Sequence, residues 1–435
     1  MKVVFSSFQW LVFILAGSIV APISIGAAFH LSPLATAELL QRTFFIIGIS
    51  GLLQVMFGHR LPITEGPAGL WWGVFIVYSG LITAGSLSGF DVLHQLEMGM
   101  LLCGLLFIFL GLMRWIGHIK KLFTPLVTGT YLMLLVAQLS GSFIKGMLGI
   151  GYFSSHVNGK IALISIGILL LSVTLSFSNN RHLKSYSILI SLGVGWLVFS
   201  LFHLTKPLTA STQWMTLPTF FSWGMPHFSG GVVITSIMIG FLLLANMVAS
   251  VNVVDTLYKK ANQPHKNVNY NVTTTVMGIT TVFAGIFSAI ACVPISGTAG
   301  FILTTKMYQR LPYILGCALL VFISFFPPLT FFFASIPAPV GYATIFIPFS
   351  GMIGLALKEY RSVPFNDNTL FIIATSLMIG LGCSFIPTNA LVALPSIFKT
   401  VLNNGLIVGM LMCILLEQGM KLKQTKTKTS DSPSP

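Results

Sequence analysis

The sequence predicts an all-α integral membrane protein with fourteen transmembrane spans, and three observations support this fold class. Of its 435 residues, 55% are hydrophobic and only 7% are charged, with a mean hydropathy of +0.90. A soluble domain carries roughly 25% charged residues, so this chain could not cover a globule with polar surface. Its apolar runs have the length of membrane helices and do not alternate as β-barrel strands do. Two distant stretches also repeat nearly the same residues, which indicates two related halves.

The spans follow in order from the apolar runs between polar segments. Their expected bounds are 8–29, 43–58, 66–82, 95–113, 122–141, 160–178, 185–204, 230–256, 270–291, 296–309, 312–333, 338–357, 369–386 and 403–418. With both termini cytoplasmic, most of the 23 Lys and Arg residues fall on the cytoplasmic side, as the positive-inside rule requires. The basic residues left outside are Arg42, Lys145, Lys160, Lys206 and Lys399.

The chain divides into two halves of seven spans each. Residues 1–207 hold the first half and residues 228–418 the second. Halves with an odd number of spans must be inverted relative to each other, as in many alternating-access transporters. Residues 419–435 end in KQTKTKTSDSPSP, which is polar, basic and rich in Ser and Pro, so we expect a disordered cytoplasmic tail.

The repeated stretch is the most informative feature of the chain. Residues 62–69 read PITEGPAG and residues 294–300 read PISGTAG, with one residue dropped. Proline and glycine do not propagate an ordinary helix. Backbone that leaves the helix at membrane depth must line a cavity or be buried in protein. Matched breaks of this kind in two halves indicate the central binding site of a transporter.

These and two further segments resemble the nucleobase–ascorbate transporter family, also called the uracil/xanthine permeases. Residues 125–130 read PLVTGT and residues 336–341 read IPAPVG, both similar to family motifs, and residues 297–306 match part of the span-ten signature. The resemblance implies a core domain of spans 1–4 and 8–11 and a gate domain of spans 5–7 and 12–14. It also implies short, strand-like segments in spans 3 and 10, and it makes a homodimer plausible.

The sequence departs from the family at its carboxylates. The acidic position of span eight falls on Asn246, and the first signature position, often Glu, is Gly297, followed by Thr298 in place of the usual Asn. Asn246 keeps a donor and an acceptor but cannot titrate. The identity of the substrate and of the coupling ion, proton or sodium, therefore stays open.

Glu65 is the candidate for coupling, because a carboxylate inside a membrane is by default a functional hypothesis. It would replace the missing family carboxylates as proton carrier or substrate acceptor. The alternative is a Glu at the cytoplasmic edge, paired with a basic loop residue. Asp255 is expected to form a local ion pair with Lys259, four residues further along the helix.

The expected substrate contacts are small, polar or aromatic residues around the two breaks. Glycines let backbone approach a ligand closely, exposed N–H groups at helix starts suit an acceptor-rich ring, and an indole can stack on it. Core packing, helix capping and interhelical bridging are the alternatives for the Trp, Thr and Gln, respectively. The candidates are Gln9, Gly66, Ala68, Gly69, Trp71, Asn246, Gly297 and Thr298.

The sequence therefore predicts a secondary active transporter for nucleobases, and more specifically for purines. We expect proton-coupled uptake across the plasma membrane by alternating access. An organic-anion or aromatic-acid carrier of the same fold, with uncoupled transport possible, is the alternative. A channel fits the hydropathy but not the matched breaks in inverted halves.

Other function classes lack a sequence signal. No HExxH, GxSxG or GxxxxGK[ST] motif supports an enzyme or an ATP-driven pump, and no cofactor is expected. The net charge of +14 is spread between apolar spans, which argues against nucleic-acid binding. The five cysteines show no metal-ligand or disulfide spacing, so no metal site is expected.

Overall fold

The computed structural model describes residues 2–83, 89–119, 124–180, 183, 187–205, 213–387, 390, 402 and 405–430. Within them, seven helices are long and apolar enough to cross a membrane, and an eighth span forms if one bent helix pair counts as a single span. The chain is therefore a multi-pass membrane protein. The total of fourteen spans stays a prediction, and the outward residues Lys206 and Lys399 and the tail residues 431–435 lie outside the described residues.

The first half of the chain is helical apart from one short strand. Its elements are α1 (Lys2–Ser18), α2 (Val20–Ala28), α3 (Pro33–Met56), β1 (Glu65–Pro67), α4 (Gly69–Thr83), α5 (Gly89–Leu112), α6 (Ile116–Ile119), α7 (Pro125–Met147), α8 (Gly159–Ser176) and α10 (Ser187–Leu201). Ser32 caps α3, since its hydroxyl accepts from the Ala35 amide at 3.1 Å and Pro33 occupies the first turn. Asn158 caps α8 in the same way.

The second half repeats this pattern of helices around one strand. Its elements are α11 (Gly230–Lys260), α12 (Tyr270–Ile286), β2 (Cys292–Pro294), α13 (Thr298–Thr305), α14 (Arg310–Ser324), α15 (Pro327–Ala334), α16 (Ala338–Arg361), α17 (Asp367–Ser384) and α19 (Gly405–Ser430). The predicted span 312–333 consists of α14 and α15, which meet at an angle of 93°. Pro327 begins α15, because proline suits the first turn of a helix but cannot continue one.

The final helix extends beyond the last predicted span. α19 continues to Ser430, through most of the segment 419–435 that was expected to be disordered. At the start of this extension, Lys421 Nζ lies 2.8 Å from Glu417 Oε1, one turn earlier. Such an i,i+4 pair of opposite charges supports an isolated helix.

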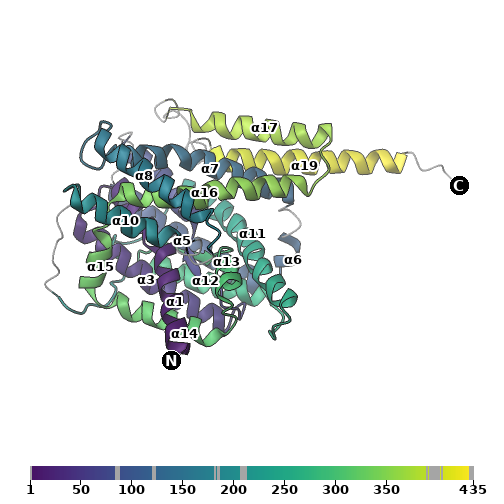
Figure 1. Ribbon diagram of the computed structural model, residues 1–435. Helices are drawn as coiled ribbons and strands as arrows, with labels where there is room; N and C mark the ends of the chain where they lie inside the picture. The colour runs from purple at the N-terminus through teal and green to yellow at the C-terminus, as the bar shows by residue number, and fades with distance from the viewer. Residues whose placement is uncertain are drawn as a thin grey trace. The chain divides into compact units, whose positions relative to one another are not determined.

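Two compact units make up the chain, and each is described by itself. The first contains Met1–Ile116 and Gly141–Ile347; the second contains Gly117–Ser140 and Pro348–Pro435. In the second unit α17 and α19 lie side by side (Figure 1). There the Tyr360 hydroxyl donates to Thr130 Oγ1 at 3.1 Å, which joins α16 to α7.

In the first unit, the tightest helix pair is α5 with α12, because glycines let the two backbones approach. A Cβ atom at Gly104 would lie 2.8 Å from the Gly278 carbonyl oxygen, and one at Gly278 would lie 2.7 Å from the Gly104 oxygen. Small residues at such crossings are typical of membrane helices, where close packing replaces the hydrophobic drive. α12 of this pair also contacts β2, the strand of the second half.

Candidate functional site

The two repeated stretches meet as a pair of short antiparallel strands. β1 pairs with β2 in the register Glu65 with Pro294, Gly66 with Val293 and Pro67 with Cys292. Two backbone hydrogen bonds extend the pairing, from Ala68 N to Ala291 O at 2.8 Å and from Ile295 N to Thr64 O at 2.9 Å. The strands thus satisfy each other's backbone groups inside the apolar chain.

Helices begin directly after both strands. α4 starts at Gly69 and α13 at Thr298, so two helix starts lie near this sheet. At the start of α13, Thr298 N already donates to Ile295 O at 3.2 Å and Ala299 N to Ser296 O at 3.0 Å. Thr298 is fully buried, and its hydroxyl accepts from the Thr64 amide at 3.1 Å. A Cβ atom at Gly66 would lie 2.2 Å from Ile295 Cδ1, so the absence of a side chain there permits the close approach of the two stretches.

Several helices pack against the strands, and two of them carry predicted site residues. α1 and α3 contact β1, while α11 and α12 contact β2, so Gln9 on α1 and Asn246 on α11 lie on helices that reach the sheet. Gln9 is half-buried, and its Oε1 atom has no hydrogen-bond partner within the described residues. Asn246 is exposed, and its Oδ1 accepts from the Ser250 hydroxyl at 3.4 Å.

The other predicted contacts differ in accessibility. Gly297 is exposed, whereas Ala68 is buried and Gly69 is half-buried. Trp71 is fully buried, and a Cβ atom added at Gly99 on α5 would lie 3.3 Å from its ring. The structure therefore brings the residues of both stretches together at the sheet, with Trp71 inside the packing between α4 and α5.

Glu65 lies in β1 with a completely buried side chain. The only ion-pair partner for it among the described residues is His59, whose Nε2 lies 3.4 Å from Glu65 Oε1. The second oxygen, Oε2, has no hydrogen-bond partner in this part of the chain, and neither has the Ser50 hydroxyl of α3, which lies beside the carboxyl. A buried carboxyl group without a Lys or Arg partner is unusual and costly if charged.

The surroundings of Glu65 are neutral. Cys292 comes from β2, while Tyr313 and Cys317 come from α14, and all three side chains are buried. The Tyr313 hydroxyl donates to the Ile63 carbonyl at 2.5 Å and so ties α14 to the stretch before β1. Sequence reasoning found Glu65 but missed His59 and Ser50. The polar run GHRLPITE, interrupting apolar sequence, was the available signal for His59.

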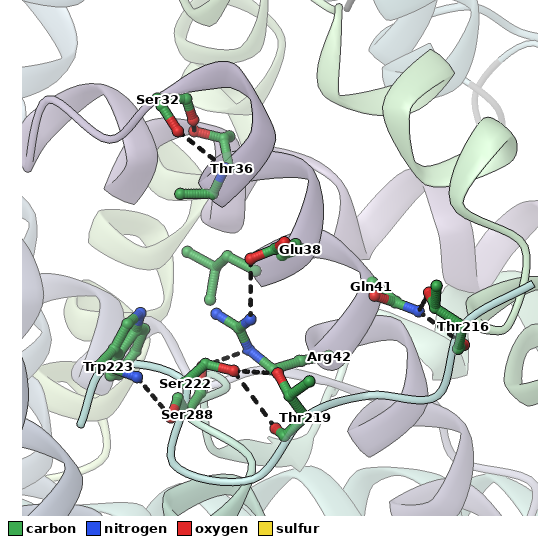
Figure 2. Close-up of polar contacts among 12 residues, drawn as sticks. Ser32, Thr36, Glu38, Gln41, Arg42, Thr216, Thr219, Ser222, Trp223 and Ser288 are labelled. Atoms are coloured by element: carbon green, nitrogen blue, oxygen red, sulfur yellow. Dashed lines mark hydrogen bonds and ion pairs between the residues drawn. The ribbon is translucent and has the colours of Figure 1, made fainter. Parts of the chain in front are cut away.

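A second buried charge cluster lies elsewhere in the first unit and was also missed. Arg42 on α3 is 2% exposed; its Nε donates to the Ser288 carbonyl at 3.2 Å and its Nη1 lies 3.9 Å from Glu38 (Figure 2). Ser288 in turn donates its hydroxyl to Glu97 on α5. The Asp255–Lys259 ion pair, by contrast, was predicted and is confirmed at 2.6 Å.

Comparison with known proteins decides the family. The chain matches the permease family over residues 1–389. It is 40% identical over 430 residues to a Bacillus subtilis (strain 168) protein named "Putative purine permease YwdJ", and the match covers 98% of each chain. This chain belongs to the permease family. The resemblance to uracil/xanthine permeases read from the sequence is thereby confirmed.

Two further comparisons show more distant similarities of this permease. It is 25% identical over 445 residues to the uric acid permease PucJ of the same organism, covering 99% of this chain and 95% of that one. It resembles the solved transmembrane domain of the cyanobacterium bicarbonate transporter BicA, with a TM-score of 0.62, 16% identity and coverage of 94% and 97%. This likeness shows a shared fold. The permease is thus a transporter and not an enzyme, and its family supports nucleobases as substrates.

Proposed function

We propose that this permease is a proton-coupled secondary transporter that takes up purines across the plasma membrane by alternating access. The observation that carries the proposal is the paired β1 and β2, each followed directly by a helix start. Paired broken segments from two halves are the pattern expected of a transporter's central site. Family membership and the purine and uric acid names of its relatives support the choice of substrate.

In this proposal fourteen spans form two inverted halves, with both termini cytoplasmic. A core domain of spans 1–4 and 8–11 carries the substrate at the paired strands. Helix-terminal N–H groups of α4 donate to ring acceptors, as helix starts do for other acceptor-rich ligands. The amides of Gln9 and Asn246 offer both donors and acceptors to a purine edge. No carboxylate is needed for this recognition.

Glu65 supplies the coupling. Its carboxyl group takes a proton from solvent when the site is open outward and returns it to solvent when the site is open inward. Three observations support this role: the side chain is buried, its Oε2 is unpartnered within the described residues, and the carboxyl lacks a Lys or Arg ion pair there. Protonation removes the cost of carrying a bare charge through the closed state.

The experiment is uptake into proteoliposomes of labelled hypoxanthine, guanine, xanthine and uracil. Each base is offered with an inward proton gradient, with an inward sodium gradient and with neither. Saturable uptake of a purine that only the proton gradient drives is the expected result. Sodium-driven uptake would remove the proton from the proposal, and uptake of uracil alone would remove the purine.

An organic-anion carrier is the second candidate, and one observation favours it. Asn246 and Gly297 stand where the family usually has carboxylates, which lowers the negative charge of the site. An anionic substrate would then lie at the helix starts without electrostatic repulsion from carboxylates at those two positions. The same liposomes, given labelled benzoate, separate the candidates, because uptake of this anion without uptake of any purine would replace the first proposal.

A further inference from the structure

His59 lies in the turn between α3 and β1 and is 1% exposed. Its two ring nitrogens have different partners. The Leu61 amide donates to Nδ1 at 3.1 Å, and Nε2 lies 3.4 Å from Glu65 Oε1. An amide N–H can only donate, so Nδ1 must be the unprotonated nitrogen. The hydrogen of the neutral ring therefore sits on Nε2 and points at the carboxyl group.

The ring is held in this neutral form. Burial lowers the pKa of His59 to about 3, and the positive charge of Arg310 acts in the same direction. An imidazolium would in addition lose the hydrogen bond from Leu61, because Nδ1 would no longer accept. His59 is therefore a fixed donor and not a second proton carrier.

This donor has a directional effect on the carboxyl group. At 3.4 Å the contact with Oε1 is long, as expected for a neutral pair. When the carboxyl group ionises, the same contact becomes a charge-assisted hydrogen bond, which is shorter and stronger. The donor also restrains Oε1, which leaves Oε2, without a hydrogen-bond partner among the described residues, as the oxygen that exchanges the proton.

We propose that His59 is the positioning residue for Glu65: its Nε2–H holds Oε1, stabilises the carboxylate form and presents Oε2 for proton exchange. The proposal rests on the proposed role of Glu65 in coupling. The other groups around the carboxyl are neutral, namely Cys292 from β2 and Tyr313 and Cys317 from α14, so none replaces this donor with a charge. Ser50 from α3 completes the set.

Two substitutions separate the two nitrogens of the ring. His59→Gln keeps an N–H near the position of Nε2 and gives up the acceptor for Leu61. His59→Asn keeps an acceptor near Nδ1 and gives up the donor to Glu65. We expect His59→Asn to slow gradient-driven purine uptake about tenfold, the loss of one hydrogen bond to a charged group. We expect His59→Gln to stay within about twofold of the unaltered protein and counterflow exchange to change little in either variant.

The controls are His156→Asn and His156→Gln, since His156 lies exposed in a loop. A second readout does not depend on transport. The infrared carboxyl band of purified protein that disappears in Glu65→Gln reports the proton on Glu65. Because the donor stabilises the carboxylate, the pH midpoint of this band should move upward in His59→Asn and stay in place in His59→Gln.

The outcomes separate this proposal from the proposed function. An unchanged band midpoint in His59→Asn overturns the positioning role, whatever happens to transport. Equal loss of uptake in both variants, with equal loss of thermal stability, assigns His59 to the fold alone and also overturns it. A shifted band in a protein that transports no base keeps the His59–Glu65 geometry and removes the transport function instead.

Discussion

Two buried carboxyl groups of this permease differ in what compensates them. Glu97 on α5 accepts a hydrogen bond from the Ser288 hydroxyl. The Ser288 carbonyl oxygen in turn accepts from Arg42 (Figure 2). Glu65 has only neutral groups beside it among the described residues, and His59 is its one ion-pair partner there. A buried charge is tolerated when it is paired and hydrogen-bonded. Each carboxyl group leaves one oxygen without a hydrogen-bond partner among the described residues. The difference is that Glu97 belongs to a hydrogen-bonded network that includes a buried arginine, whereas Glu65 has neutral neighbours, as its proposed coupling role requires.

The Arg42 region also has a structural task. Several hydrogen bonds hold the segment 213–229, which precedes α11, against this region. The Trp223 amide donates to Ser288 Oγ at 3.3 Å, and His94 on α5 hydrogen-bonds to the Trp223 carbonyl. Gln41 donates to both oxygens of Thr216, the carbonyl at 3.1 Å and the hydroxyl at 2.9 Å. The strands around Glu65 hold no comparable charged network among the described residues.

The largest expected effect is loss of stability at the Arg42 cluster. Arg42→Met leaves Glu97 buried without its cation, which should lower the free energy of unfolding by about 3–5 kcal/mol. Unfolding in detergent micelles, followed by denaturant titration, measures it. Glu38→Gln is the matched control, because Glu38 is 48% exposed and contacts Arg42 at 3.9 Å, so its loss should change little. A variant Arg42→Met as stable as the parent would mean that the cluster does not hold the fold.

The next effect is on transport at Glu65. Glu65→Gln keeps the size of the side chain and removes the titrating group, so gradient-driven uptake should fall about a hundredfold, as for loss of a positioned proton-transfer group. Stability should be unchanged or higher, since no buried charge remains. Uptake in proteoliposomes and unfolding in micelles are measured on the same preparation. Intact, pH-dependent uptake in this variant would end the role of Glu65.

How much the sequence could predict differs between these two regions. Glu65 stood out because it sits among Pro62, Gly66 and Pro67, residues that no continuous membrane helix would carry. The family was likewise predicted from short local motifs, and the membrane class was predicted from composition. Arg42 and Glu97 sit in helical runs, and their common partner Ser288 is 246 residues from Arg42. Such a network appears only when distant elements pack, so no local pattern contains it.

For the same reason, only part of the packing at the candidate site could be predicted. Repetition of PITEGPAG and PISGTAG indicated that the two stretches belong together, and the structure pairs them. The packing of Trp71 against α5 and the exposure of Asn246 depend on how helices rotate about their axes. Weak amphipathicity in a membrane helix leaves that rotation undetermined by sequence, because lipid-facing and core-facing residues are both apolar.

A smaller effect is expected within the strand region. Thr298→Val removes the acceptor of the Thr64 amide and leaves a buried N–H unpaired, which should cost about 1–3 kcal/mol of stability. Thr298→Ser keeps the hydroxyl and should restore most of the loss. Because β1 and α13 carry the proposed site, Thr298→Val should also raise the KM for the purine, whereas Arg42→Met should leave KM unchanged in the folded fraction. Equal KM values for Thr298→Val and Arg42→Met would indicate that the substrate does not bind at the strands.

The smallest expected effect is a loss of stability at Gln41, in the region of Arg42. Gln41→Met has similar length but cannot donate to Thr216, so it should lower stability by about 0.5–1.5 kcal/mol. Uptake per folded molecule should stay as it is, because the segment 213–229 is fastened to α3, α5 and the end of α12 and need not move against them. Uptake per folded molecule is obtained from initial rates normalised to monodisperse protein. If uptake per folded molecule fell while the free energy of unfolding stayed the same, the segment 213–229 would be one of the parts that move during transport. The contrast between a static region around Arg42 and a titrating region at the strands would then be wrong.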